Sequence, residues 1–198
     1  MSTQETDALD QADMARLAAG HEPALNALMD RHAGGLFGFL CRFGGDPYAA
    51  NDLAQETFVR VYQHRTEFKP GRRFSTWLFT IAGNLARNHL RARSRRPEVP
   101  LDAGGQDDDG PSLADSLPAV GGTPADHAQR EEQQAAVRHA VAELPDDLRE
   151  AIVLCELEDR SVAEAAGILT TTVKAVESRL YRARQQLRQR LTRWLTMN

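Results

Sequence analysis

Apolar residues recur every three or four positions along most of the chain, which is the period of an α-helix. The clearest apolar stripe, near the end of the chain, consists of Val173, Val176, Leu180, Ala183, Leu187 and Leu191. Similar spacings predict helices over about residues 10–19, 22–43, 47–66 and 75–95, and then over about 128–143, 146–157, 161–167 and 172–194. No segment alternates with the period of a strand over a useful length, so we expect an all-α fold.

Residues that favour helix ends stand at several of these boundaries. Gly44 and the glycine after it can end one helix. Ser161 with Glu164 has the spacing of a capping box, and Thr172 can cap the last predicted helix. The local signals therefore agree with the hydrophobic period.

A segment without apolar period separates the two groups of helices. It reads E-V-P-L-D-A-G-G-Q-D-D-D-G-P-S-L-A-D-S-L-P and is rich in Gly, Pro and Asp. Such a composition cannot bury enough apolar surface to offset the entropy lost on ordering. We therefore expect two small helical domains, residues 1–96 and 128–198, joined by a flexible acidic linker over 97–127.

Charge is distributed unevenly, although the formal net charge is only -4. Between Phe68 and Pro97 there are eight basic residues and no acid, whereas residues 98–136 hold nine acids and one basic residue. Segregated charge of this kind indicates a polyanionic partner. The polar, acidic start of the chain and the lack of a long apolar run predict a cytoplasmic protein without membrane insertion.

The last predicted helix has a polar face opposite its apolar stripe. This face consists of Lys174, Glu177, Ser178, Tyr181 and Arg182. A short helix and a tight connection precede it, which is the layout of a helix-turn-helix whose second helix meets base edges in a major groove. A solvated amphipathic helix with a basic surface accounts for the same periodicity, so the pattern alone leaves both interpretations open.

The predicted helix over 75–95 presents a second polar stripe, made of Thr80, Asn84, Arg87, Arg91 and Arg95, with Trp77 at its edge. Unpaired bases stack on aromatic rings, and arginines bind phosphates, so this arrangement suits a single-stranded nucleic acid. Trp77 could equally be a core residue above a merely soluble face. The acid-free loop F-K-P-G-R-R-F-S-T-W beside it favours nucleic acid.

A third surface lies on the predicted helix over 47–66. Val59 and Tyr62 fall among the polar residues Gln55 and Glu56 rather than on the apolar side. Apolar groups on a polar face suggest a protein contact, although single exposed apolar residues are common.

Four blocks in register carry a resemblance to a known family. They are D-L-A-Q-E-T-F-V-R-V-Y, F-S-T-W-L-F-T-I-A-G-N-L-A-R-N-H-L-R, L-P-D-D-L-R-E-A-I-V-L and V-K-A-V-E-S-R-L-Y-R-A-R. Over about residues 10–96 and 130–192 the chain resembles bacterial RNA polymerase sigma factors of the extracytoplasmic-function (ECF) group. The resemblance implies that a region-two domain grips the polymerase clamp and melts the minus-ten element. A region-four domain would read the minus-thirty-five element and sit on the polymerase flap.

The resemblance also implies roles for individual residues. It assigns polymerase binding to Gln55, Glu56, Val59 and Tyr62. Contacts with the minus-ten element, duplex and then melted, fall to Lys69, Arg72, Arg73, Phe74, Ser75, Thr76, Trp77, Asn84, Arg87, Asn88 and Arg91. Contacts with the minus-thirty-five element fall to the polar face Lys174, Glu177, Ser178, Tyr181 and Arg182.

Two further points follow from the resemblance. An anti-sigma factor is an expected partner, besides core RNA polymerase and promoter DNA. The family usually has glycine in the turn of the helix-turn-helix, where this chain has Thr170. A β-branched residue fits a positive φ poorly, which leaves the shape of this turn open.

Other functions are less consistent with the sequence. A stand-alone helix-turn-helix regulator would bind duplex DNA without polymerase, but it would not need the Trp77 face or the Val59 surface. An enzyme is not expected, because the six histidines have no metal-ligand spacing and no phosphate loop or nucleophile motif is present. We therefore predict no catalytic residue, no metal and no cofactor. Cys41 and Cys155 form no C-x-x-C pair and are interpreted as core residues.

Overall fold

The structure, a computed structural model, describes residues 3–44, 46–95 and 124–197, and every regular element in these ranges is helical. The first group comprises α1 (Thr3–Ala18), α2 (Pro23–Gly44), α3 (Pro47–Gln63), the 3-10 turn η1 (Arg65–Glu67) and α4 (Phe74–Arg95). The second comprises α5 (Pro124–Ala142), α6 (Asp146–Ile152), the π-helical turn η3 (Val153–Leu157), α7 (Val162–Ile168) and α8 (Val173–Met197). The predicted all-α fold is confirmed.

Two elements differ from the expectation. Helix α5 begins at Pro124, inside the predicted linker, because proline is well tolerated in the first turn of a helix. The predicted helix over 146–157 changes to π-helical geometry at Val153, which inserts a bulge before the chain turns towards α7. The rest of the predicted linker, residues 97–123, lies outside the described residues.

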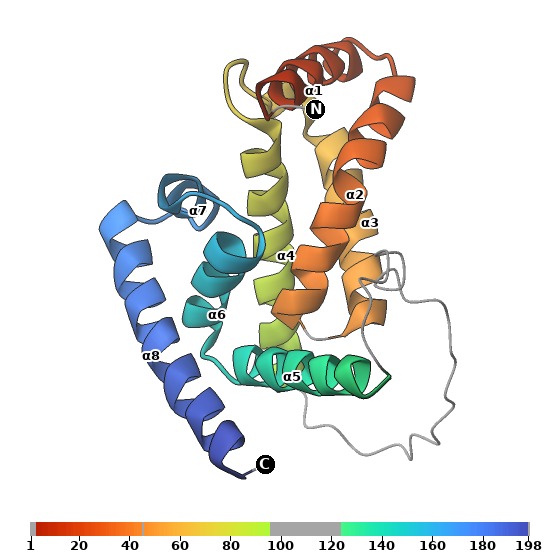
Figure 1. Ribbon diagram of the computed structural model, residues 1–198. Helices are drawn as coiled ribbons and strands as arrows, with labels where there is room; N and C mark the ends of the chain where they lie inside the picture. Colours follow the sequence, from red (N-terminus) through yellow and green to blue (C-terminus); the bar gives the residue numbers. More distant parts are fainter. Residues whose placement is uncertain (1–2, 45, 96–123, 198) are drawn as a thin grey trace.

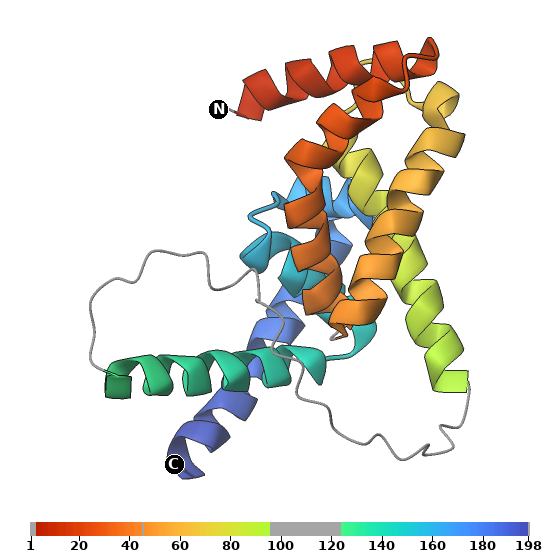
Figure 2. The ribbon, with the colours of Figure 1, turned by 90° about the vertical axis from the view of Figure 1, so that its right-hand side faces the viewer.

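Helices α2, α3 and α4 pack side by side, and α1 lies across one end of them (Figures 1 and 2). Their shared core contains the buried residues Met14, Leu17, Leu28, Leu36, Phe39, Phe43, Phe58, Phe74, Leu78 and Phe79. The ring of Phe39 lies 5.2 Å from that of Phe79 and 6.0 Å from that of Phe43. The Phe39–Phe79 pair therefore joins α2 to α4 within the core.

Helix α1 is held by buried ion pairs as well as by Met14 and Leu17, which lie in the shared core. Asp10 and Asp13 are buried, and both accept hydrogen bonds from Arg31 of α2, at 2.9 and 2.6 Å. His32 Nε2 lies 2.8 Å from the second oxygen of Asp10. Because each buried carboxylate has a close cationic partner, removing one partner would leave an uncompensated charge.

The second group packs its short helices against α8, and α5 lies across the end of the first group opposite to α1 (Figures 1 and 2). Val176, Leu180 and Ala183 of α8 are buried, and Leu187 packs at the edge of the core. These positions confirm the centre of the predicted apolar stripe. Val173, the first of the stripe, is exposed. No helix in the described ranges has the length and apolar character required to cross a membrane.

Both predicted caps around the turn between α7 and α8 are present. The Ser161 side chain accepts from the backbone of Glu164, whose carboxylate accepts from Ser161 N in return. Thr172 Oγ1 accepts from Ala175 N at 3.2 Å. Between these caps Thr170 has φ 51°, so the threonine adopts the left-handed conformation that normally favours glycine.

This conformation leads to a test of stability. A left-handed conformation costs a residue with a Cβ roughly 1–2 kcal/mol, and glycine avoids this cost but loses more entropy on folding. We expect Thr170→Gly to raise the free energy of unfolding by about 1 kcal/mol in urea denaturation. Thr171→Gly is the matched control, because Thr171 has no positive φ and should lose stability. Equal effects of the two changes would contradict the strain at Thr170.

Candidate nucleic-acid and polymerase interfaces

The polar face of α8 is exposed and complete. All five predicted residues, Lys174, Glu177, Ser178, Tyr181 and Arg182, are exposed in the first turns of the helix. Tyr181 is 63% exposed, and its hydroxyl accepts from Gln185 Nε2 at 3.0 Å. Because Val176 and Leu180 are buried on the other side, the orientation of this face is fixed by the core.

The basic loop before α4 is anchored by α1. The side-chain amide of Gln11 donates to the Arg72 carbonyl and accepts from Gly71 N. Gly71 has φ 82°, which lets the loop turn sharply at this point. Lys69 and Arg72 are consequently held on the surface. Sequence reasoning missed Gln11, since no local pattern links it to a loop sixty residues away.

Two predicted DNA-binding residues are not on this surface. Phe74 is 0% exposed and Ser75 is 6% exposed. Phe74 begins α4, and its ring lies 5.1 Å from the His32 ring and 6.2 Å from the Phe68 ring. The sequence interpretation placed both side chains on the DNA-facing loop, and the structure instead buries them, because they lie in the first turn of α4, where the Phe74 ring joins the core.

Trp77 is partly a core residue and partly a surface residue, so it has features of both interpretations that the sequence left open. Its ring lies 5.3 Å from Phe68 and 6.3 Å from Phe74, so part of it belongs to the aromatic core. The residue is nevertheless only partly buried. A ring supported on one side and accessible on another can stack with an unpaired base.

The polar side of α4 meets the second group of helices. Asn84, Asn88 and Arg91 are exposed, whereas Arg87 is partly covered. Arg87 donates to Asn84 and approaches the Glu150 carboxylate of α6 with Nε and Nη1 at 3.4 Å. The structure therefore brings the predicted promoter-facing arginine close to an acid from the other half of the chain.

Two more predicted residues, at the start of α4, meet the same group. Arg73 donates to Asp7 Oδ2 at 2.7 Å and to Glu164 of α7. Thr76 is partly covered and lies close to Gly167 of α7. Neither Asp7 nor Glu164 was foreseen as a neighbour of the basic loop.

The Val59 surface on α3 has well-defined polar neighbours. Val59 is 46% exposed, with Gln55 exposed beside it, and Glu56 accepts from Arg60 at 2.8 Å. The Tyr62 hydroxyl donates to Glu22 at 2.7 Å, and this hydrogen bond raises the pKa of Tyr62. All four predicted polymerase-binding residues thus share α3, and Tyr62 also contacts Glu22, the residue that precedes α2.

Arg65 packs against Tyr62 of this surface. Its guanidinium lies 4.4 Å from the centre of the Tyr62 ring, and Nη1 donates to the Tyr62 carbonyl at 2.7 Å. The stacked cation holds the ring orientation. Sequence reasoning missed this residue, because its position in η1 follows from the end of α3 rather than from helical period.

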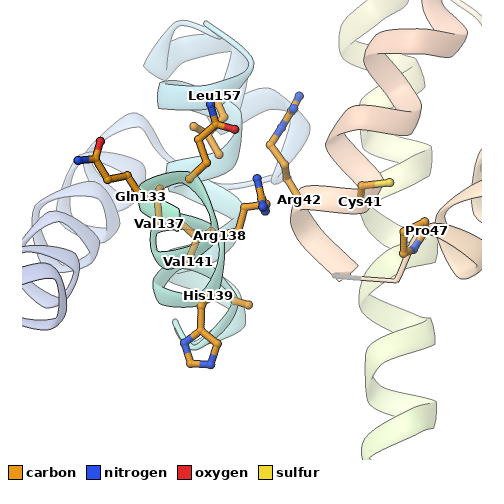
Figure 3. A pocket seen from close by; sticks show the side chains of 11 residues that line it. Cys41, Arg42, Pro47, Gln133, Val137, Arg138, His139, Val141 and Leu157 are labelled. Carbon is orange, nitrogen blue, oxygen red and sulfur yellow. The ribbon is translucent and has the colours of Figure 1, made fainter. Parts of the chain in front are cut away.

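A groove of about 970 Å³ lies where α2 and α3 meet α5 and η3 (Figure 3). Its lining includes Cys41, Arg42, Pro47, Val137, Arg138 and Leu157. None of the predicted site residues lines it. Burial raises the pKa of Cys41 and likewise of Cys155, which disfavours the reactive thiolate form.

Comparison with known proteins identifies the class. Residues 28–96 match the family model for Sigma-70 region 2, and residues 134–187 match that for Sigma-70, region 4. The chain is 34% identical over 187 residues to the RNA polymerase sigma-H factor of Pseudomonas aeruginosa, covering 94% of each protein. It is 32% identical over 172 residues to the ECF RNA polymerase sigma factor SigW of Bacillus subtilis, covering 87% and 91%. The chain therefore belongs to the sigma-70 family, and within it to the ECF group.

Solved structures support the same assignment. The structure of CnrH in complex with the cytosolic domain of CnrY matches with a TM-score of 0.68 at 30% identity, covering 93% of this chain and 97% of that one. The sigma factor RpoE in complex with the anti-sigma factor NepR from Bartonella quintana matches with a TM-score of 0.62 at 25% identity, covering 84% and 96%. The sequence-based prediction of an ECF sigma factor is confirmed.

Glu150 has a strongly raised pKa. It is 3% exposed, and burial raises its pKa to about 7 despite the opposing charges of Arg87 and Arg179. The nearby carboxylates of Asp146 and Asp147 raise it further. One carboxylate oxygen, Oε1, has no hydrogen-bond partner among the described residues. Glu150 is therefore a buried acid that is expensive to ionise.

This burial predicts a pH-dependent difference. Ionising Glu150 in the folded protein costs about 3 kcal/mol, the equivalent of the rise from 4.5 to about 7. The folded state should therefore lose stability as pH rises through this window. Glu150→Gln cannot ionise, so its advantage in the free energy of unfolding should be small at about pH 5 and reach about 3 kcal/mol at about pH 8. The exposed Glu131→Gln is the control, and a pH-independent advantage would contradict the buried charge.

Proposed function

We propose that this chain binds core RNA polymerase and directs promoter recognition, DNA melting and transcription initiation, with no catalytic chemistry of its own. The observation that carries the proposal is the presence of two different nucleic-acid surfaces in one chain. Residues 1–96 form region two, with its basic loop and Trp77. Residues 128–198 form region four, with the exposed face of α8, and residues 97–127 connect the two.

The α8 face suits duplex DNA. Arginine and lysine donate to guanine, and glutamate accepts from cytosine, so Arg182, Lys174 and Glu177 together can distinguish base pairs in a major groove. Tyr181 adds an exposed ring for a thymine methyl or a phosphate. We assign this face to the minus-thirty-five element.

The α4 surface suits a melted strand. Trp77 offers a supported ring for stacking, and Lys69, Arg72 and Arg91 supply positive charge for phosphates. Stacking on a base that has left the duplex stabilises the open state relative to the closed one. We assign this surface, which also includes Asn84 and Asn88, to the minus-ten element.

The remaining partners are proteins. The Val59 surface of α3 is assigned to the polymerase clamp, and region four to the flap. RpoE of Bartonella quintana is bound by an anti-sigma factor in its structure, and we extend such a partner to this chain. A protein that works with RNA polymerase acts in the cytoplasm.

The alternative is a stand-alone regulator that binds duplex DNA through α8 without polymerase. A gel-shift series on promoter duplex, with the chain alone, core polymerase alone and the two together, separates the functions. We expect a sequence-specific complex only with both components. Tight, specific binding by the chain alone would favour the regulator.

Base readout by α8 is tested with Arg182→Ala in the holoenzyme. A bidentate contact with a base is worth about 1–3 kcal/mol of discrimination, so the variant should lose affinity for the best promoter and tolerate changes at one base pair. Arg190→Ala is the matched control, because Arg190 lies on the same helix but binds Glu143, the residue that follows α5. Equal losses on all promoters from both variants would remove Arg182 from base readout.

Melting is tested with Trp77→Ala and Trp77→Phe. Because stacking becomes available only after the duplex opens, Trp77→Ala should reduce permanganate-reactive open complex while closed-complex affinity stays within about twofold. Trp77→Phe keeps a ring and should recover most of the opening. Equal opening by wild type and Trp77→Ala, with folding verified by circular dichroism, would exclude the stacking role.

Phe74 belongs to the core rather than to the α4 surface. Its ring is fully buried, so Phe74→Ala should lower the free energy of unfolding by about 3–5 kcal/mol. Urea denaturation measures this loss directly. A fully stable Phe74→Ala variant that fails only in promoter opening would return Phe74 to the DNA surface.

A further inference from the structure

The basic loop, residues 68–73, holds its backbone in a tight turn. The Arg72 amide donates to the Lys69 carbonyl at 3.2 Å, across Pro70 and Gly71. Proline in the second position and a positive φ in the third, 82° at Gly71, are features of a type II turn. The turn leaves the Lys69 and Arg72 side chains exposed, and its own hydrogen bond uses neither the Gly71 amide nor the Arg72 carbonyl.

The side-chain amide of Gln11 binds these two remaining groups. Its oxygen accepts from Gly71 N at 3.3 Å, and its nitrogen donates to the Arg72 carbonyl. Figure 1 shows the loop beside the first half of α1. The oxygen and nitrogen of an amide lie in one plane, so both hydrogen bonds form only when the turn has one orientation relative to α1.

Asp7 of α1 holds the residue that follows the turn. It lies four positions before Gln11 and therefore on the same face of the helix. Asp7 Oδ2 accepts from Arg73 Nε at 2.7 Å, and both side chains are partly covered. Helix α1 thus binds three consecutive residues of the loop, two through their backbone and one through its guanidinium.

Helix α1 is itself fixed to the rest of region two. Its buried Asp10 accepts from Arg31 of α2 at 2.9 Å and lies 2.8 Å from His32 Nε2. The His32 ring lies 5.1 Å from the ring of Phe74, the first residue of α4. Because α1, α2 and the start of α4 are connected in this way, the loop is attached to a frame that is already in place.

We propose that Gln11 and Asp7 are positioning residues for minus-ten recognition, which fix the loop so that the Lys69 and Arg72 side chains meet the promoter in one geometry. Neither positioning residue has to touch DNA. Contacts with phosphates do not distinguish sequences, whereas contacts with base edges require donors held in a defined place. The inference rests on the proposed function of the α4 surface and adds that its base selectivity depends on α1.

Hydrogen exchange in the free, full-length protein tests the clamp. Gln11→Met has nearly the same length but makes neither hydrogen bond. The Gly71 amide loses its acceptor, so its exchange rate, measured by nuclear magnetic resonance, should rise at least about threefold. Gln133→Met is the matched control, because Gln133 is an exposed glutamine of α5. An unchanged rate at Gly71 in Gln11→Met would overturn the clamp.

Promoter selection by the holoenzyme tests the consequence. Core polymerase with each chain transcribes a library randomised over the minus-ten element of a promoter that the wild type uses, and the transcripts are sequenced. Gln11→Met should lower the preference for the best base about three- to tenfold at one or more minus-ten positions, the scale of one or two hydrogen bonds. Preferences in a minus-thirty-five library should stay within about twofold. Each preference is a ratio obtained with one protein, so a smaller folded fraction does not change it.

A combined substitution separates positioning from direct contact. In a Lys69→Ala and Arg72→Ala background the side chains that Gln11 positions are absent. Adding Gln11→Met to this background should therefore cause no further loss of minus-ten preference. A further loss as large as that in the wild-type background would show that Gln11 acts on its own and would overturn the positioning role.

Asp7→Asn tests the second attachment. Asparagine keeps an acceptor but removes the charge that binds Arg73. The minus-ten preferences should fall by less than in Gln11→Met, because Arg73 retains Glu164 as a partner. Asp30→Asn is the matched control, since it removes the same charge from an exposed site on α2. Equal losses from both variants would show a general charge effect and overturn the role of Asp7.

The outcomes separate this inference from the proposed function. A wild-type holoenzyme that selects no minus-ten sequence overturns the proposed function, while hydrogen exchange at Gly71 still reports the clamp. A wild-type holoenzyme that selects a sequence, together with a Gln11→Met holoenzyme that selects it equally well, overturns the inference and leaves the function in place.

Discussion

Helix α4 packs against other helices on two sides, and the rest of the structure depends on these two sets of contacts. Its apolar residues Leu78 and Ala82 are buried in the core with α2 and α3. Phe79 is buried between both halves of the molecule, with the Phe39 ring 5.2 Å away and the Arg160 guanidinium 4.5 Å away. Helix α4 therefore packs on both halves of the molecule, on α2 and α3 through its apolar side and on α7 through its other side. This double packing links the two groups of helices.

Much of the fold could be predicted, because burial imposes the helical period on the sequence. The stripe through Val176, Leu180 and Ala183 shows this directly, and the Ser161 cap was visible because it depends on residues three positions apart. The anchoring of α1 by Arg31 could not be predicted in this way. Contacts between distant segments depend on how helices lie against one another, and one sequence contains no local signal for that.

The candidate sites were predictable to different degrees for the same reason. On α8 the buried stripe fixes the opposite face, so all five proposed recognition residues are exposed together. At the start of α4 the family motif does not distinguish surface from core, and Phe74 and Ser75 proved to be buried. At Thr170 the residue type is a poor guide. Its φ is 51°, although a β-branched residue disfavours this left-handed conformation. Tertiary contacts on both sides of the turn outweigh this local preference.

This chain gives core RNA polymerase its choice of promoter. The most direct measurement is in vitro transcription on fragmented genomic DNA from the source organism, with sequencing of the RNA 5′ ends. We predict discrete start sites that require both core polymerase and the chain and that share two upstream sequence elements separated by a constant spacing. Start sites that do not differ between core polymerase alone and core polymerase with the chain would contradict the account.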